Sequence, residues 1–148
     1  MSNADVMKNT YRSFLLFGLI PIILSSCELS FETVVVYDNR NDFIGSYEVE
    51  EYSESMTSTF IYDITIRKSR YSDGVIWINN FYDANIQVFA EVKGNKFYIP
   101  LQRIGIWEIE GRGSLFGGDE LSMTYTVREI MPGPDYVDFL NSIAWKFY

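Results

Sequence analysis

Apolar and polar residues alternate along nearly the whole chain from Asp42 onward. A two-residue period is typical of strands that bury one face, because successive side chains of a strand point to opposite sides. The pattern is clearest at residues 121–128, where Leu, Met, Tyr and Val alternate with Ser, Thr and Arg. Strands are predicted at residues 45–50, 60–67, 75–81, 86–93, 97–101, 107–112, 121–128 and 143–147.

Short turn signals separate these strands. Gly94-Asn95 suits a two-residue hairpin, since both residues tolerate a positive φ, and residues 72–74 and 117–118 mark further reversals. Short connections imply antiparallel neighbours. An open meander of eight strands would leave two unpaired edges, and closure removes them. The sequence therefore predicts an all-β fold, an antiparallel meander of about eight strands closing into a barrel. Its interior is either filled by side chains or holds one small ligand.

Three local features are also expected. Pro100 cannot donate a hydrogen bond to a β-ladder, and it predicts a bulge or a strand end. Residues 135–141 follow a Pro- and Gly-rich break and are expected to form a turn of helix. Residues 33–37 are apolar enough to form a short strand ahead of the barrel.

The N-terminal segment has the pattern of an export signal. Lys8 and Arg12 precede an uncharged run at residues 14–24, which is too short to cross a bilayer as a helix. The run ends in Leu24-Ser25-Ser26-Cys27, which resembles the bacterial lipobox. That resemblance implies cleavage before Cys27 and acylation there, and two or more acyl chains make a stable anchor. We interpret residues 1–26 as a lipoprotein signal peptide (1–6 as an over-called start or a cloning remnant), 27–41 as lipid anchor and tether, and 42–148 as the barrel domain.

Composition narrows the functional classes. The chain has 12 Lys and Arg against 20 Asp and Glu and no basic cluster, so nucleic acid is not an expected partner. The sequence contains no histidine, which removes Ser-His-Asp and Cys-His catalysis and every His-based metal site. Cys27 is the only cysteine, so no intrachain disulfide can form. No metal and no cofactor are predicted.

Six segments, taken in order, resemble small lipocalin-like lipoproteins of Bacteroidetes-type bacteria. They are residues 42–49, 78–81, 88–92, 99–102, 109–113 and 121–125. The resemblance runs from about residue 42 to residue 128, and it rests on the ordered set of strand-and-turn patterns. It implies a lipocalin-like antiparallel barrel that is exported as a lipoprotein and named lipid-binding. Some members carry a hydrolase label, but the resemblance supplies no catalytic residues.

Acidic side chains are the first candidates for chemistry. Glu50, Glu51 and Glu54 cluster on and after the first strand, and Glu108 and Glu110 share a face of the sixth. Two facing carboxylates could act on a glycoside if one were buried and its pKa raised. Because these residues alternate with an apolar face, we expect them to point outward into solvent.

Two other segments have simple interpretations. Residues 38–42 are rich in oxygen ligands, but Phe43 and Val49 stand where a Ca²⁺ loop needs Gly and Glu, which favours a polar turn. Residues 111–117 superficially resemble a phosphate-binding loop, yet they join two strands and do not open a helix. Close backbone packing inside a barrel explains their glycines better.

Aromatic residues are the remaining candidates. Rings on the predicted inner faces could line an apolar cavity, with tyrosine hydroxyls orienting a ligand, or they could simply fill the barrel. These rings are Tyr47, Phe60, Tyr62, Phe97, Trp107, Tyr125 and Trp145. A second set is expected on the outer faces, where a flat patch of rings could stack on sugars or dock a protein. It comprises Tyr52, Phe89 and Tyr98.

Three functional hypotheses follow, all for a lipoprotein of the cell envelope, at the outer membrane with the leaflet left open. The first is a non-enzymatic barrel, anchored through Cys27, that binds a small apolar or lipidic ligand through Tyr47, Tyr62, Trp107 and Tyr125. The second is a structural or interaction lipoprotein with a filled core, which docks an envelope protein or a glycan through an outer patch. The third is a hydrolase without histidine, which two buried carboxylates in one cleft would favour.

Overall fold

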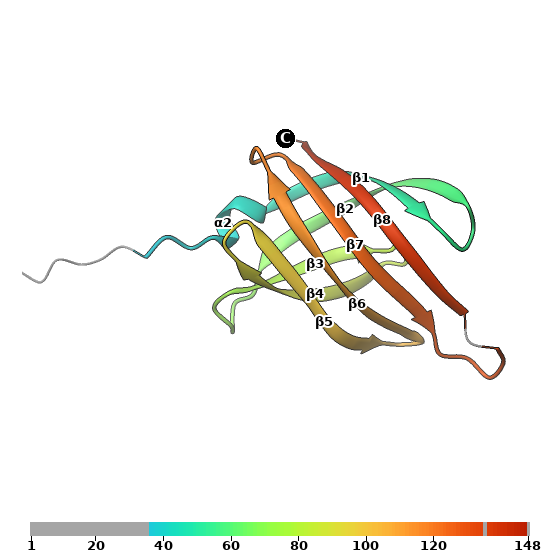
Figure 1. The fold of residues 1–148 in the computed structure, drawn as a ribbon. Helices are drawn as coiled ribbons and strands as arrows, with labels where there is room; N and C mark the ends of the chain where they lie inside the picture. The colour runs from blue at the N-terminus through green and yellow to red at the C-terminus, as the bar shows by residue number, and fades with distance from the viewer. Residues whose placement is uncertain (1–35, 135, 148) are drawn as a thin grey trace, which may run out of the picture. The chain divides into compact units, whose positions relative to one another are not determined.

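The computed structural model describes residues 36–134 and 136–147, which form a closed barrel of eight antiparallel strands preceded by one short helix (Figure 1). The predicted all-β fold is therefore confirmed. Each strand lies beside the strand that precedes it in the sequence, so the meander runs once round the barrel. The elements are α2 (Arg40–Phe43), β1 (Gly45–Ser53), β2 (Ser58–Lys68), β3 (Val75–Phe81), β4 (Ile86–Lys93), β5 (Lys96–Ile104), β6 (Trp107–Phe116), β7 (Glu120–Glu129) and β8 (Tyr136–Phe147).

Closure depends on the first and last strands, which pair along most of their lengths. β1 and β8 are in antiparallel register from Ser46, opposite Phe147, to Ser53, opposite Leu140. The same residues of β1 pair with β2 on the other side. β1 therefore has a partner strand on both sides, and the two edges that an open meander would expose are removed.

The two-residue period separates a packed interior from a wet exterior. In β7, every second side chain from Leu121 to Val127 is buried. Aromatic rings meet inside the barrel: Phe81 and Tyr125 have centroids 4.4 Å apart, and Phe43 and Phe97 have centroids 5.8 Å apart. Together with apolar side chains from all eight strands, these ring pairs fill the interior.

Two glycines of β6 allow neighbouring side chains to enter this interior. A Cβ atom on Gly111 would lie 2.3 Å from the Cβ atom of Tyr125, and one on Gly113 would lie 2.2 Å from the ring of Phe97. Both partners are directly opposite the glycines in the adjacent strands. The predicted close packing at these glycines is confirmed.

The turn between β3 and β4 is strained. Three of its non-glycine residues, and Asn80 near the end of β3, have a positive φ between 49° and 59°; the three are Tyr82, Asp83 and Asn85. The side chain of Asn80 braces the turn, accepting a hydrogen bond from the amide of Asn85 at 3.0 Å and donating one to the carbonyl of Asp63 at 2.8 Å. Because each such backbone conformation costs on the order of 1 kcal/mol, the turn persists only through its surroundings.

Of three expectations about strand ends, one is wrong, one holds in part and one is confirmed. Residues 136–141 form no turn of helix, because the ladder with β7 continues to Tyr136 opposite Glu129. Phe60 is on the inner face of β2, as predicted, because it lies opposite Glu51, but it is 41% exposed, since β2 pairs with β3 only from Thr65 onward. The register between β5 and β6 shifts across Pro100, as predicted.

The inward orientation expected for Trp145 is also wrong. Trp145 is 43% exposed, and Ile143 and Phe147 share its outer face. The smaller Ala144 points inward instead, because the register places it opposite the buried Val49 of β1.

The segment ahead of β1 differs from expectation as well. Val36 and Tyr37 form no strand, and the short helix α2 replaces most of the polar turn expected at residues 38–42. Residues 33–35, the signal segment and Cys27 lie outside the described residues. No helix within the described part of the chain is long and apolar enough to cross a membrane.

Gly113→Ala is expected to lower the free energy of unfolding by about 1–3 kcal/mol, the usual cost of overpacking a filled core. The added methyl group would overlap the ring of Phe97. Trimming that ring should relieve the overlap, so the double variant Gly113→Ala/Phe97→Leu should be more stable than the two single losses predict. Urea unfolding of the four proteins measures this coupling, and strictly additive losses would contradict the packing.

Candidate functional site

The two ends of the barrel differ in chemistry. α2 closes one end, where Phe43 is fully buried and its carbonyl accepts a hydrogen bond from the Tyr47 hydroxyl at 2.9 Å (Figure 1). At the other end, the turns that follow β1, β3, β5 and β7 meet, and polar side chains enter the interior. We call this second end the polar end. Its side chains are Glu51, Ser53, Tyr62, Tyr82, Trp107, Tyr125, Asp138 and Ser142.

Glu51 places a carboxylate inside the barrel. The residue is 2% exposed, and its Oε2 accepts hydrogen bonds from the hydroxyls of Tyr62, at 2.6 Å, and Tyr125. The two hydroxyl oxygens lie 3.3 Å apart. Groups from β1, β2 and β7 therefore converge on one point.

Ser142 adds an unpaired hydroxyl beside this carboxylate. The residue is 3% exposed, and its Oγ is buried without a hydrogen-bond partner. Ser142 lies directly opposite Glu51 in the β1–β8 ladder, and both residues face inward. Opposite residues on one face have Cβ atoms about 4.5–5.5 Å apart. A buried hydroxyl without a partner costs about 1–3 kcal/mol, so this position keeps hydrogen-bonding capacity that the fold does not use.

Asp138 supplies a second buried carboxylate, closer to the turns. Both of its oxygens lie 2.8 Å from the hydroxyl of Ser53, and Oδ1 also accepts from the amide of Ser55 at 3.3 Å. The hydroxyl of Tyr82 donates to Oδ2 at 3.3 Å. The ring of Tyr82 packs edge-on against Trp107, with centroids 5.7 Å apart, and both residues are partly exposed. This ring pair forms part of the rim of the polar end.

Burial controls the protonation of these groups. Burial raises the pKa of Glu51 above its ordinary value; hydrogen bonds from Tyr125 and Tyr62 oppose the rise, and the charge of Asp138 adds to it. Burial, reinforced by the charge of Glu51, raises the pKa of Tyr62 and of Tyr125 well above the usual range for a phenol. Both phenols therefore remain protonated donors at neutral pH.

No buried base neutralises the two carboxylates. Among the described residues, Arg40 is the one buried base, and it pairs with Asp38 at the α2 end. Within residues 36–134 and 136–147, no three His, Cys, Asp or Glu side chains gather closely enough to hold a metal ion. The hydrogen-bond donors described above for Glu51 and Asp138 are therefore all neutral.

The structure brings together three of the four residues predicted to contact a ligand. Tyr62 and Tyr125 join their hydroxyls at Glu51, and Trp107 lies at the rim of the same end. Tyr47 lies apart from them, because its hydroxyl donates to the carbonyl of Phe43 at the opposite end of the barrel.

The outward orientation expected for Glu51 is wrong. The two-residue period that buries Tyr47 and Val49 continues to Glu51 and Ser53, so the pattern itself contained the signal. Asp138 was missed because its segment was interpreted as a helical turn. The other acidic candidates of the strands and turns are exposed or partly exposed: Glu50, Glu54, Glu108 and Glu110.

The arrangement is suited to binding. Two buried carboxylates at one end meet only part of the condition that would favour a hydrolase, which also required a cleft shared by both. Moreover, Glu51 is bound by two phenols, and Asp138 is bound by a hydroxyl, an amide and a third phenol. A few converging polar groups in an apolar wall, held by packed strands, are typical of sites that orient a ligand.

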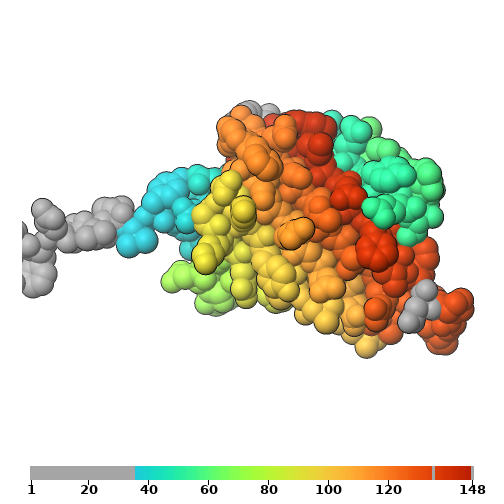
Figure 2. Space-filling model, viewed as in Figure 1, coloured from blue at the N-terminus to red at the C-terminus, as the bar shows by residue number. Residues whose placement is uncertain are grey.

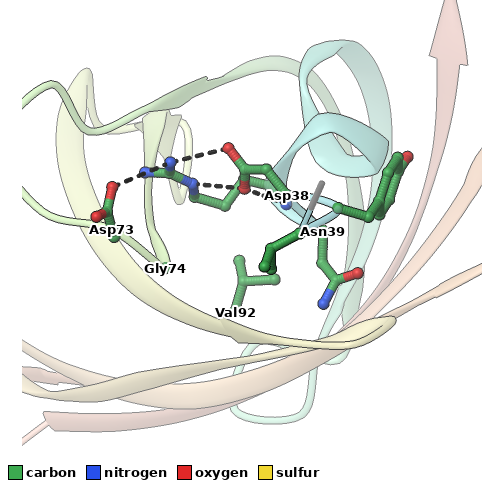
Figure 3. Close-up of a pocket in the computed structure, with 8 residues that line it drawn as sticks. Asp38, Asn39, Asp73, Gly74 and Val92 are labelled. Carbon is green, nitrogen blue, oxygen red and sulfur yellow. Dashed lines mark hydrogen bonds and ion pairs between the residues drawn. The ribbon is translucent and has the colours of Figure 1, made fainter. Parts of the chain in front are cut away.

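A hollow of about 450 Å³ lies at the α2 end, and the charged residues that line it have a structural role (Figure 3). Nε and Nη2 of Arg40 donate to the two carboxylate oxygens of Asp38, both at 2.8 Å, and Nη1 donates to the carbonyl of Ser72 at 2.9 Å. Nη2 also lies 3.5 Å from Asp73, and Nζ of Lys68 lies 2.8 Å from Asp38. The bonds from Arg40 and then Lys68 hold the pKa of Asp38 well below its usual range. They fasten the segment that enters the barrel to the loop between β2 and β3.

The three rings predicted for the outer surface are all on outward faces, but they do not gather in one patch. Phe89 packs against Trp77, with ring centroids 5.9 Å apart. Tyr52 and Tyr98 are more exposed and line two different hollows of the outer wall.

Comparison with known proteins supports the fold. The chain is similar to a solved structure described as a redesigned β-barrel, with a TM-score of 0.51 and 11% sequence identity, covering 75% of this chain and 96% of that chain. At this identity the likeness shows the fold alone. No family model and no curated protein matches the chain.

Glu51→Gln is expected to change how stability depends on pH. Because the folded-state pKa of Glu51 is raised, its contribution to stability is complete below the ordinary value of 4.5 and is lost as the pH rises through the folded-state value. The variant lacks this group, so its free energy of unfolding should fall less than that of the wild type between pH 4.5 and neutral pH.

Urea unfolding at a series of pH values measures this difference. Glu50→Gln is the matched control, because Glu50 is exposed on the opposite face of the same strand, and this variant should follow the wild type. Parallel profiles for the wild type and Glu51→Gln would argue against a buried carboxylate with a raised pKa.

Proposed function

We propose that the protein is a lipid-anchored binding protein of the cell envelope, whose barrel holds a small ligand at its polar end and catalyses no reaction. The ligand has an apolar or lipidic body and a polar head. The observation that carries this proposal is the convergence of Glu51, Tyr62 and Tyr125 at one end of a barrel with an apolar core. The resemblance to lipocalin-like lipoproteins supports the same class of function.

A purely structural role accounts poorly for this cluster. Burying a charged group costs several kcal/mol, and apolar residues of similar volume often give equal or greater stability. Glu51 and Asp138 are nevertheless both buried, and the hydroxyl of Ser142 is left without a partner. Buried polar groups of this kind, retained against stability, are typical of functional sites.

Backbone strain points to the same end of the barrel. The turn between β3 and β4 holds Tyr82 with a φ of 59°, and this places its hydroxyl on Asp138 and its ring on Trp107. Conformations of this kind cluster at binding sites, where the surrounding structure maintains them.

The filled interior limits where the ligand lies. The ring pair of Phe81 and Tyr125 occupies the space beneath the polar end, so a long chain would not enter the barrel without displacing it. The apolar body therefore lies at the rim, against Tyr82 and Trp107. The polar head reaches the hydroxyls of Tyr62 and Tyr125.

Cys27→Ala is expected to abolish acylation and to leave the protein soluble or uncleaved, because the acyl anchor forms on the thiol of this cysteine. Metabolic labelling with an alkyne-tagged fatty acid, followed by gel analysis, measures the attachment. Ser25→Ala exchanges one small residue for another ahead of the cysteine, and it should still be labelled. Continued labelling of the Cys27→Ala protein would overturn the anchor.

Binding at the rim can be measured with N-phenyl-1-naphthylamine, a neutral apolar fluorophore with one polar N–H group. Its fluorescence should rise on binding. Trp107→Ala should weaken binding at least tenfold, because an apolar contact of about 1.5–3 kcal/mol is lost. Tyr62→Phe keeps the ring and removes the hydroxyl, so it should weaken binding by a smaller factor. Trp145→Ala, on the outer face, is the matched control and should bind as the wild type does.

Equal binding by all four proteins, or no binding by the wild type, would contradict a site at the polar end. Native mass spectrometry gives an independent measurement on the domain purified from its own host. A small molecule should accompany the wild type and be absent from Trp107→Ala.

A further inference from the structure

Two adjoining hollows lie on the outer surface of the barrel, on the opposite face of the sheet from the buried side chains of the polar end. They have volumes of about 350 and 360 Å³, and they share Thr124 of β7 and Asn141 of β8. They lie on strands β5 to β8 and on the adjoining β1 and β2, and of these strands β5 to β8 face the viewer in Figure 2. We call the pair of hollows the outer groove. The residues that define it here are Tyr52, Tyr98, Thr124, Phe139, Asn141 and Trp145.

Aromatic rings line both halves of the outer groove. Tyr52 and Trp145 lie along one hollow, and Tyr98 and Phe139 lie along the other. All four residues are exposed, although rings of this size are usually covered. Exposed apolar surface that lines a concave site marks a place of contact with another molecule.

Polar side chains lie where the two hollows adjoin, between the two pairs of rings. Thr124 donates to Oδ1 of Asn141 at 3.3 Å, and Nδ2 of Asn141 donates to Glu54 at 3.3 Å. Both bonds are long and exposed, so they stabilise the fold little. These hydroxyl, amide and carboxylate groups are therefore available to exchange partners with the hydroxyl groups of a ligand.

The charge of the outer groove disfavours an anionic ligand. Glu50 lines one hollow, and Glu54 and Glu110 line the other, against a single base, Arg112. The whole chain also carries a formal net charge of −8. A neutral ligand with many hydroxyl groups avoids this repulsion and still forms hydrogen bonds with the carboxylates.

We propose that the outer groove binds a neutral oligosaccharide. The C–H faces of sugar rings would pack on the four aromatic rings, and the hydroxyl groups would bind Thr124, Asn141 and Glu54. Phe139 and Trp145 are six residues apart on β8, which corresponds to roughly 20 Å along the strand, so the ligand comprises several sugar units. The groove is not uniformly acidic, because hydroxyl and amide groups lie at its centre and Arg112 lines one hollow, and this favours a neutral ligand over a basic protein partner. This site is separate from the polar end and does not depend on a ligand there.

Affinity electrophoresis tests the proposal with defined polysaccharides. Native gels contain laminarin, xyloglucan, galactomannan or yeast mannan as neutral probes, and polygalacturonate as an anionic probe. At least one neutral polysaccharide should retard the wild-type domain, and polygalacturonate should not. Trp145→Ala should raise the dissociation constant obtained from the retardation at least tenfold. Tyr98→Ala should raise this dissociation constant as well.

Tyr71→Ala is the matched control, because Tyr71 is a 97% exposed ring outside the groove, and its retardation should equal that of the wild type. Unchanged urea unfolding of the exposed-ring variants shows that they fold. The proposal is overturned if no neutral polysaccharide retards the wild type, or if Trp145→Ala and Tyr71→Ala behave alike. Retention of the wild type on an immobilised cationic protein, without retardation by any polysaccharide, would assign the groove to a protein partner instead.

Discussion

The pairing of β1 with β8 is the interaction on which the rest of the structure depends. It closes the meander, and its register decides which side chains of the last strand face inward. In this register Glu51 stands opposite Ser142 on the inner face, and Trp145 lies on the outer face. A slip of one residue would turn every side chain of β8 over, moving Trp145 into the barrel and expelling Asp138. The polar end and the outer groove are therefore two consequences of a single register.

The barrel separates stability from recognition along its axis. The interior is apolar in the middle and beneath α2, where Phe43, Phe97 and the inward-facing isoleucines of β2 and β3 are almost completely buried, and this burial supplies most of the stability. The polar end works against stability: it contains buried carboxylates, an unpaired hydroxyl at Ser142 and a strained turn at Tyr82. A rigid apolar scaffold that holds a few poorly compensated polar groups at one end is the physical basis of the proposed binding function.

Local features of the fold were predictable from the sequence, and features that depend on register between distant strands were not. The strand rhythm, the hairpin at Gly94-Asn95, the irregularity at Pro100 and the close packing at Gly111 each follow from a few neighbouring residues. The orientation of β8 does not, because its larger residues suggested the wrong buried face, and only pairing with β1 settles which face is inside. For Glu51, the alternation that buries Tyr47 and Val49 extends to it, but the prediction grouped it with neighbouring acidic residues that point outward. Asp138 follows a Pro- and Gly-rich break, which concealed the start of its strand.

Cross-strand nuclear Overhauser effects in the isotope-labelled domain test the central claim most directly. The closed barrel predicts contacts between backbone protons of Glu51 and Ser142, and between those of Glu48 and Trp145, because these residues are paired in the β1–β8 ladder. It also predicts slow amide exchange along the paired parts of both strands. Contacts displaced by one residue along β8, or two rapidly exchanging strands with no contacts between them, would contradict the register and with it both proposed sites.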